Sequence, residues 1–148
     1  MVVTEAGQSR RVVRIRRLLP VTTEEAFLAW TDAQALSQWM SPSGTASATI
    51  DLRVGGRLRI VMSGEGMEIE HTGEYRQIEP PRRLVFTWRS EFTAGEETLV
   101  TLEFRREGDQ TELLLTHQRL PDEQVDPHKG GWDQILERLR VYLDGLHI

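Results

Sequence analysis

Between Thr45 and Gln118 the chain alternates apolar and polar residues with a period of two, the pattern of β-strands that bury one face. Turn residues interrupt this alternation at Gly55-Gly56, within residues 63–66, at Pro80-Pro81 and at Gly108-Asp109. Because each run between turns has one apolar and one polar face, the pattern predicts an antiparallel meander that is covered on one side only.

Ahead of the meander, residues 10–19 mix apolar residues with arginines and predict a first strand, which Pro20 ends. Thr22 and Glu25 then have the spacing of a capping box, which predicts the start of a helix. Asp32 can cap a second, short helix. The apolar residues that recur at helical spacing in this second helix are Leu36, Trp39 and Met40.

The C-terminal segment has a helical period. Its apolar stripe consists of Trp132, Ile135, Leu136, Leu139, Leu143 and Leu146. Val125 and His128 are candidates to extend the stripe toward the N-terminus. The cap of this helix has two candidates, which are Asp122, or Asp126 with Pro127 in the first helical position.

Together these elements predict an α+β fold, in which a curved six- to seven-stranded antiparallel sheet wraps around a long C-terminal helix and two short helices follow the first strand. A strongly twisted sheet does not close tightly around one helix, so we expect an apolar cavity between the two. We assign residues 10–148 to this single domain and residues 1–9 to a flexible N-terminus.

Composition narrows the classes of function. The 148 residues include 23 acidic and 18 basic ones, for a net charge of -5, which argues against a nucleic-acid partner. The absence of cysteine excludes disulfides, thiolate nucleophiles and cysteine-ligated metals. No stretch is long and apolar enough to span a membrane, and the N-terminus lacks the features of a signal peptide, so we expect a cytoplasmic protein.

Short motifs spread along the chain add a family resemblance, which rests on their order and spacing. The residues that carry it are Pro20, Glu24-Glu25-Ala26-Phe27, residues 35–39 with Pro42, residues 54–58, Gly73-Glu74-Tyr75, Ile78, residues 80–88, Thr111-Glu112-Leu113, Thr116-His117, Gly131-Trp132, Leu136 and Leu139. From about Arg10 to Leu143 the sequence resembles the AHSA1-type family, named for the activator of the Hsp90 ATPase, within the START-like (SRPBCC, helix-grip, birch-pollen-allergen-like) superfamily. The resemblance implies the helix-grip fold and a cavity between sheet and long helix, and it implies much less about activity.

The candidate ligand-binding residues lie on the apolar faces of the predicted sheet and C-terminal helix, except for two that we expect near the cavity mouth, Trp39 and Met40. Each of them can also be an ordinary core residue, and for most of them singly this is the better explanation. As a set, with several large aromatic side chains and a few polar groups, they favour a pocket. They are Trp39, Met40, Met62, Ile69, His71, Tyr75, Phe86, Trp88, Leu102, Phe104, His117, Trp132, Ile135, Leu136 and Leu139.

His71 and His117 are the polar residues of most interest, because both fall on the predicted apolar face. They can contact the polar end of a ligand, act as an acid/base pair, or bond to neighbouring protein groups. For catalysis the last explanation is favoured, because no third group visibly orients either ring. We predict no metal site, since two histidines make at most half a zinc site and the strand carboxylates alternate outward.

Three functions remain open. First is a binding module for a small apolar or amphipathic ligand, without a cofactor. Second is a protein-interaction module whose partner is a chaperone or another protein, which an exposed apolar patch around Trp39 and Met40 would support. Third is a cyclase- or hydratase-type enzyme that uses His71 or His117 for proton transfer. The sequence is compatible with a monomer or a homodimer.

Overall fold

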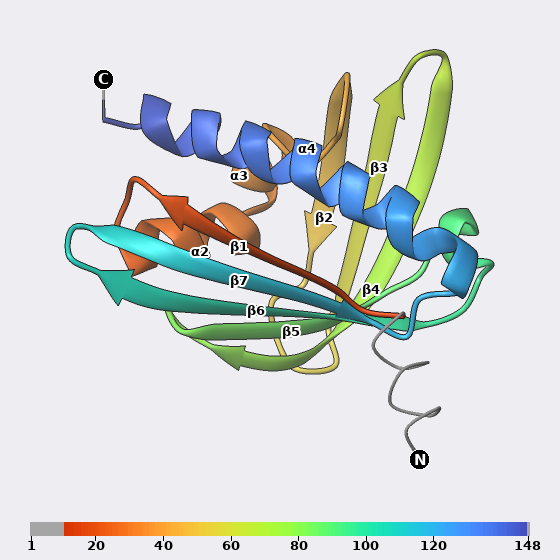
Figure 1. Cartoon of the computed structure of the whole chain (residues 1–148), viewed down its shortest axis with the longest axis horizontal. Helices are drawn as coiled ribbons and strands as arrows, with labels where there is room; N and C mark the ends of the chain where they lie inside the picture. The colour runs from red at the N-terminus through yellow and green to blue at the C-terminus, as the bar shows by residue number, and fades with distance from the viewer. Residues whose placement is uncertain (1–10, 148) are drawn as a thin grey trace.

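The computed structural model describes residues 11–147. The predicted flexible segment 1–9 and the first residue of the predicted first strand lie outside this range. Within the range the structure is an α+β fold of the predicted helix-grip type, in which helix α4 lies across one face of a curved sheet (Figure 1).

The sheet has seven antiparallel strands in the order β1-β7-β6-β5-β4-β3-β2. Strands β2 to β7 form the predicted meander, since each pairs with the next along the chain, and β1 pairs with β7 as an edge strand. The strands are β1 (Val13–Leu19), β2 (Thr45–Ile50), β3 (Arg57–Gly64), β4 (Met67–Glu79), β5 (Arg83–Trp88), β6 (Thr98–Glu107) and β7 (Gln110–Gln118).

The sheet bends along β4, whose register with β5 shifts between Tyr75 and Gln77. Gly73 lies just before this shift, and a Cβ atom there would stand 2.1 Å from the carbonyl oxygen of Thr87 on β5. The missing side chain therefore permits the close approach of the two strands at the bend. Beyond the bend the β3–β4 hairpin rises beside α4 (Figure 1).

Two short helices, α2 (Thr23–Thr31) and α3 (Ala33–Ser37), follow β1 as predicted. The capping box is present, because the backbone N–H of Glu25 donates to Thr22 Oγ1 at 3.2 Å and the N–H of Thr22 donates to the Glu25 carboxylate at 3.1 Å. Asp32 caps α3 by accepting from the N–H of Ala35 at 2.9 Å. Trp39 and Met40 follow α3 rather than belonging to it.

The long helix α4 spans Val125–Gly145 and follows directly on a short 3₁₀ helix, η2 (Asp122–Gln124). Both predicted caps are wrong, because α4 begins after Gln124 and has no side-chain cap. Because η2 runs directly into α4, the long helix does not begin with a side-chain cap. Leu146 lies beyond the helix and is 47% exposed, so the apolar stripe ends at Leu143.

The core lies between the sheet, α2, α3 and α4. It includes Phe27 and Trp30 from α2, Leu36 from α3, and Trp39 from the loop after α3. The sheet contributes Phe86, Leu102, Phe104 and Leu115, and α4 contributes Leu136, Leu139 and Leu143. Within residues 11–147, no helix is long and apolar enough to cross a membrane.

Two glycine substitutions test the packing at the bend. Gly73→Ala should lower the free energy of unfolding by about 1–3 kcal/mol, because the new methyl group forces β4 and β5 apart. Gly130→Ala in α4 is the matched control, since a Cβ atom there meets no atom within 4 Å and alanine is the better helix former. It should raise the stability by about 1 kcal/mol. Urea unfolding measures both changes, and a neutral result for Gly73→Ala would contradict the close approach.

Candidate functional site

A pocket of about 630 Å³ lies between the N-terminal half of α4, the β3–β4 hairpin, the end of β5 and the loop that follows α3. Its apolar lining consists of Pro42 from the loop after α3, Met62, Met67 and Ile69 from the hairpin, Trp88 at the end of β5, Phe92 shortly after it, and Pro127, Trp132 and Ile135 from α4. Its polar lining includes His71, His128, three serines and two glutamines. This pocket lies at the N-terminal end of α4, and that it is the apolar ligand cavity expected from the sequence stays a prediction.

The predicted ligand-binding residues divide into two groups. Six of them line the pocket: Met62, Ile69, His71, Trp88, Trp132 and Ile135. The other nine are buried away from it: Trp39, Met40, Tyr75, Phe86, Leu102, Phe104, His117, Leu136 and Leu139. Contact of the six with a ligand stays a prediction.

The expected position of Trp39 and Met40 at the pocket mouth is wrong. Each is 1% exposed. The ring of Trp39 packs edge-on against Trp30, with centroids 4.6 Å apart. The chain turns inward after α3, so these side chains fill the core, and the next residues, Ser41 to Ser43, reach the pocket instead.

His117 is fully buried and bonded on both ring nitrogens. Trp132 Nε1 donates to its Nδ1 at 3.0 Å, so Nδ1 carries no proton and Nε2 donates to Thr98 Oγ1 at 2.7 Å. The Thr98 hydroxyl donates in turn to the carbonyl of Trp88. Burial, and then the nearby His128 and His71, lower the pKa of His117 well below its usual value. The ring is therefore a neutral structural link.

His71 has a different environment. Its ring packs on Trp88, with centroids 4.7 Å apart, and lines the pocket. Its Nδ1 is enclosed and has no hydrogen-bond partner among residues 11–147. Burial lowers the pKa of His71 to about 4, His128 lowers it further, and the backbone of Ile69 acts in the opposite direction. The ring is therefore neutral at pH 7 and keeps unused hydrogen-bonding capacity.

His128 is a pocket residue that the sequence suggested only as an extension of the apolar stripe. Its Nδ1 lies 2.8 Å from the backbone oxygen of Gln124, one helical turn earlier. A carbonyl can only accept, so Nδ1 carries the proton and Nε2 is left with its lone pair. Burial lowers the pKa of His128, and the hydrogen bond to Gln124 opposes the change.

Arg138 of α4 fixes the loop at the pocket mouth, which sequence reasoning missed. Its guanidinium donates to the carbonyl oxygens of Ser41 at 2.7 Å and Gly44 at 3.2 Å. Pro42 and the Gly131-Trp132 pair were visible as motifs, but nothing in the sequence indicated that they meet across one pocket.

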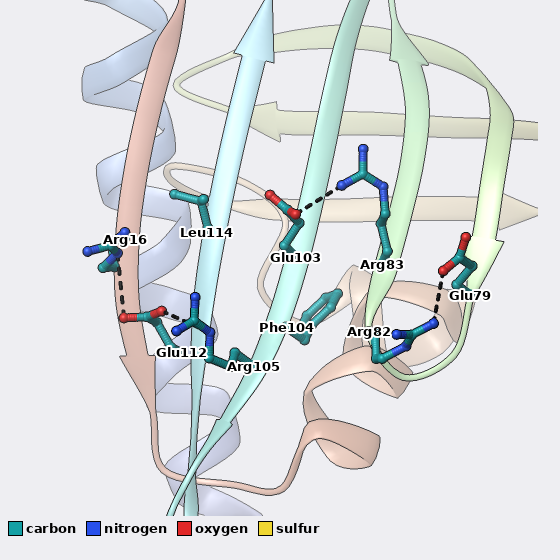
Figure 2. A pocket seen from close by; sticks show the side chains of 9 residues that line it. All are labelled: Arg16, Glu79, Arg82, Arg83, Glu103, Phe104, Arg105, Glu112 and Leu114. Carbon is teal, nitrogen blue, oxygen red and sulfur yellow. Dashed lines mark hydrogen bonds and ion pairs between the residues drawn. The ribbon is translucent and has the colours of Figure 1, made fainter.

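A second pocket, of about 300 Å³, lies on the opposite face of the sheet from α4 (Figure 2). It is a charged surface hollow. The carboxylate of Glu112 pairs with Arg16 at 3.5 Å, and that of Glu103 pairs with Arg83 at 2.9 Å. Partly exposed pairs of this kind satisfy one another in water and contribute little, so this hollow is a weaker candidate than the pocket at α4. Among residues 11–147, no group of three histidines and carboxylates could hold a metal ion.

Comparison with known proteins places the chain in context. A family model described as "Activator of Hsp90 ATPase homolog 1-like protein" matches residues 20–144. No curated protein sequence matches the chain significantly.

Solved structures share its fold. A protein from Rhodobacter sphaeroides is 26% identical, with 93% of this chain and 95% of that chain covered and a TM-score of 0.80. CalU16 from Micromonospora echinospora is also 26% identical, with 89% and 75% covered and a TM-score of 0.71. DynU16, from the dynemicin biosynthetic locus, is 24% identical, with 90% and 47% covered and a TM-score of 0.76.

The bond between Trp132 and His117 can be tested by substitution. Trp132→Phe should lower the free energy of unfolding by about 1–3 kcal/mol beyond the loss from volume, because it leaves the buried Nδ1 of His117 unpaired. Trp39→Phe is the matched control, since the indole N–H of Trp39 has no partner in the described part of the chain. Urea unfolding of both variants gives the difference. Equal losses would mean that the hydrogen bond adds no net stability.

The neutral imidazoles also predict a pH dependence. The pKa values of His71 and His117 are lowered in the fold from 6.5, so the unfolded chain binds more protons below that pH. Stability should be complete well above pH 6.5 and fall as the pH falls, by roughly 2 kcal/mol from His71 by about pH 5, with further losses from His117 and His128, whose pKa values are also lowered. Urea unfolding across this range measures the loss. His71→Phe should remove the part that comes from His71, and a flat profile in the unmodified protein would contradict the assignment.

Proposed function

The chain belongs to the family of activator of Hsp90 ATPase homolog 1-like proteins, and from this premise we propose that it binds a small apolar or amphipathic molecule in the pocket beside α4. The observation that carries the proposal is the pocket itself. Its volume of about 630 Å³ falls within the range of small-molecule sites, roughly 300–1,000 Å³. Its lining of tryptophan, methionine and isoleucine side chains around a few polar groups suits a ligand that is mostly apolar.

The two other functions have less support. The interaction module rested on an exposed patch around Trp39 and Met40, and both side chains are buried. An enzyme using His117 would need a ring nitrogen free to take a proton, whereas both are engaged. His71 remains as a pocket imidazole, but it has no bonded acid or base among residues 11–147 to orient it for proton transfer.

Two neighbouring glycines of α4 allow a sharp test of pocket binding. Gly131 lines the pocket and Gly130 does not, and a Cβ atom at either position meets no atom within 4 Å. Gly131→Phe should therefore fill the pocket without disturbing the helix, whereas Gly130→Phe should point a similar ring elsewhere. We expect Gly131→Phe to weaken binding of the neutral fluorescent probe 1-aminoanthracene at least about tenfold, which is about 1.4 kcal/mol.

Gly130→Phe should bind the probe as the unmodified protein does, and thermal unfolding should show both variants folded. Absence of saturable probe binding in the unmodified protein would refute the proposed function. Equal binding by the two variants would place the ligand outside this pocket.

A further inference from the structure

The lining of the pocket contains almost no charged side chains. None of its residues is an arginine or a lysine, although the chain has 18 of these residues. The one acidic side chain in the lining is that of Glu65, at the exposed turn between β3 and β4. The guanidinium of Arg138 at the pocket mouth is bonded to the carbonyl oxygens of Ser41 and Gly44. A bound carboxylate or phosphate would therefore lose its water without gaining a cation from the lining, and it would meet a protein of net charge -5.

Two imidazoles stand among the polar groups of the lining, beside three serines and two glutamines. His128 projects from α4 with its Nδ1 committed to the Gln124 carbonyl, so its remaining nitrogen can only accept. His71 is contributed by β4, packs on Trp88 with the ring planes tilted by 35°, and is 6% exposed. Its Nδ1 is enclosed, so Nε2 is the nitrogen that a ligand can reach. In a pocket that excludes water, a ligand hydroxyl that donates to a lone pair of these rings gains a hydrogen bond.

The protonation states agree with this geometry. Burial is the largest cause of the lowered pKa in both rings, and a proton on His128 would further disfavour one on His71. Neither ring therefore supplies a positive charge at pH 7. The lone pair of His128 is on Nε2, and the neutral ring of His71 likewise has one lone pair and one N–H.

We propose that the pocket selects a neutral molecule that carries a hydroxyl donor on a flat apolar body, with His71 and His128 as the accepting groups, and that it discriminates against carboxylates. This inference rests on the proposed function and adds the chemical class of the ligand. Trp88, Trp132 and Phe92 supply apolar surface to the body of the ligand. Hydrogen bonds to the two imidazoles set the orientation of the ligand in the pocket.

Three probes of matched shape test the selectivity. They are 2-naphthol, its methyl ether 2-methoxynaphthalene, which lacks the donor, and 2-naphthoate, which carries the negative charge. At pH 7 we expect 2-naphthol to bind roughly three to ten times more tightly than the ether, the ratio expected from one hydrogen bond, and 2-naphthoate to bind more weakly than both. Isothermal titration calorimetry measures the three affinities.

The outcomes separate the two proposals. If 2-naphthol and its ether bind equally, or if 2-naphthoate binds most tightly, the selectivity is refuted while pocket binding stands. If none of the three binds and 1-aminoanthracene also fails, the proposed function is refuted and the selectivity with it.

Histidine variants test the accepting groups. The double variant His71→Phe/His128→Phe keeps aromatic rings at both positions and removes all four nitrogens. It should bind 2-naphthol and the ether with equal affinity, and its affinity for the ether, within about twofold of the unmodified protein, reports an intact pocket. His147→Phe is the control, because His147 pairs with Glu25 at 2.9 Å away from the pocket and should leave the preference unchanged. A preference for 2-naphthol that survives in the double variant would refute the role of the two rings.

Histidine ¹⁵N NMR of the unmodified protein gives a readout that does not depend on how the variants fold. Adding 2-naphthol should shift the ring nitrogen signals of His71 or His128 more than the ether does, and it should leave those of His117 and His147 in place. Equal shifts from the two probes would contradict hydrogen bonding to the imidazoles.

Discussion

The fold depends on how one helix covers the apolar face of a curved sheet. The contacts between helix α4 and the sheet differ on the two sides of Trp132. Its indole N–H donates to His117 on β7, and its ring packs against Trp88 on β5, with centroids 5.5 Å apart. On its C-terminal side, α4 presents Leu136, Leu139 and Leu143 to the core. On its N-terminal side, the same helix borders the pocket.

The reason for this division is local. The turn before Trp132 carries Gly131, which lines the pocket and has no side chain to fill it. Opposite it, the pocket is bordered by the part of the β3–β4 hairpin that precedes the register shift near Tyr75. Arg138 then holds the loop after α3 at the mouth. A glycine on the helix, an irregular sheet and a tethered loop together leave about 630 Å³ unfilled.

The sequence predicted the fold well because the fold rests on periodicity. The strand alternation, the Thr22–Glu25 capping box and the stripe from Trp132 to Leu143 are signals that neighbouring residues carry by themselves. The site was predicted only in part, because residues on one apolar face look alike in sequence whether they pack or line a space. Trp39 and Trp88 illustrate this: both are aromatic and 1–2% exposed, yet only Trp88 borders the pocket. Whether such a residue packs in the core or lines a pocket depends on the curvature of the sheet, which adjacent residues do not encode.

His71 and His117 show how three-dimensional context separates two residues of the same type. Alternation placed both on the apolar face, and both are buried there. His117 faces an indole N–H and a threonine hydroxyl, which together use its donor and its acceptor. His71 faces the ring of Trp88 and the pocket, and its enclosed nitrogen finds no partner among residues 11–147. Alternation along a strand therefore identifies a buried imidazole but not its partners. The partners depend on what the neighbouring strands and helix α4 place opposite the ring, and only the fold brings those groups together.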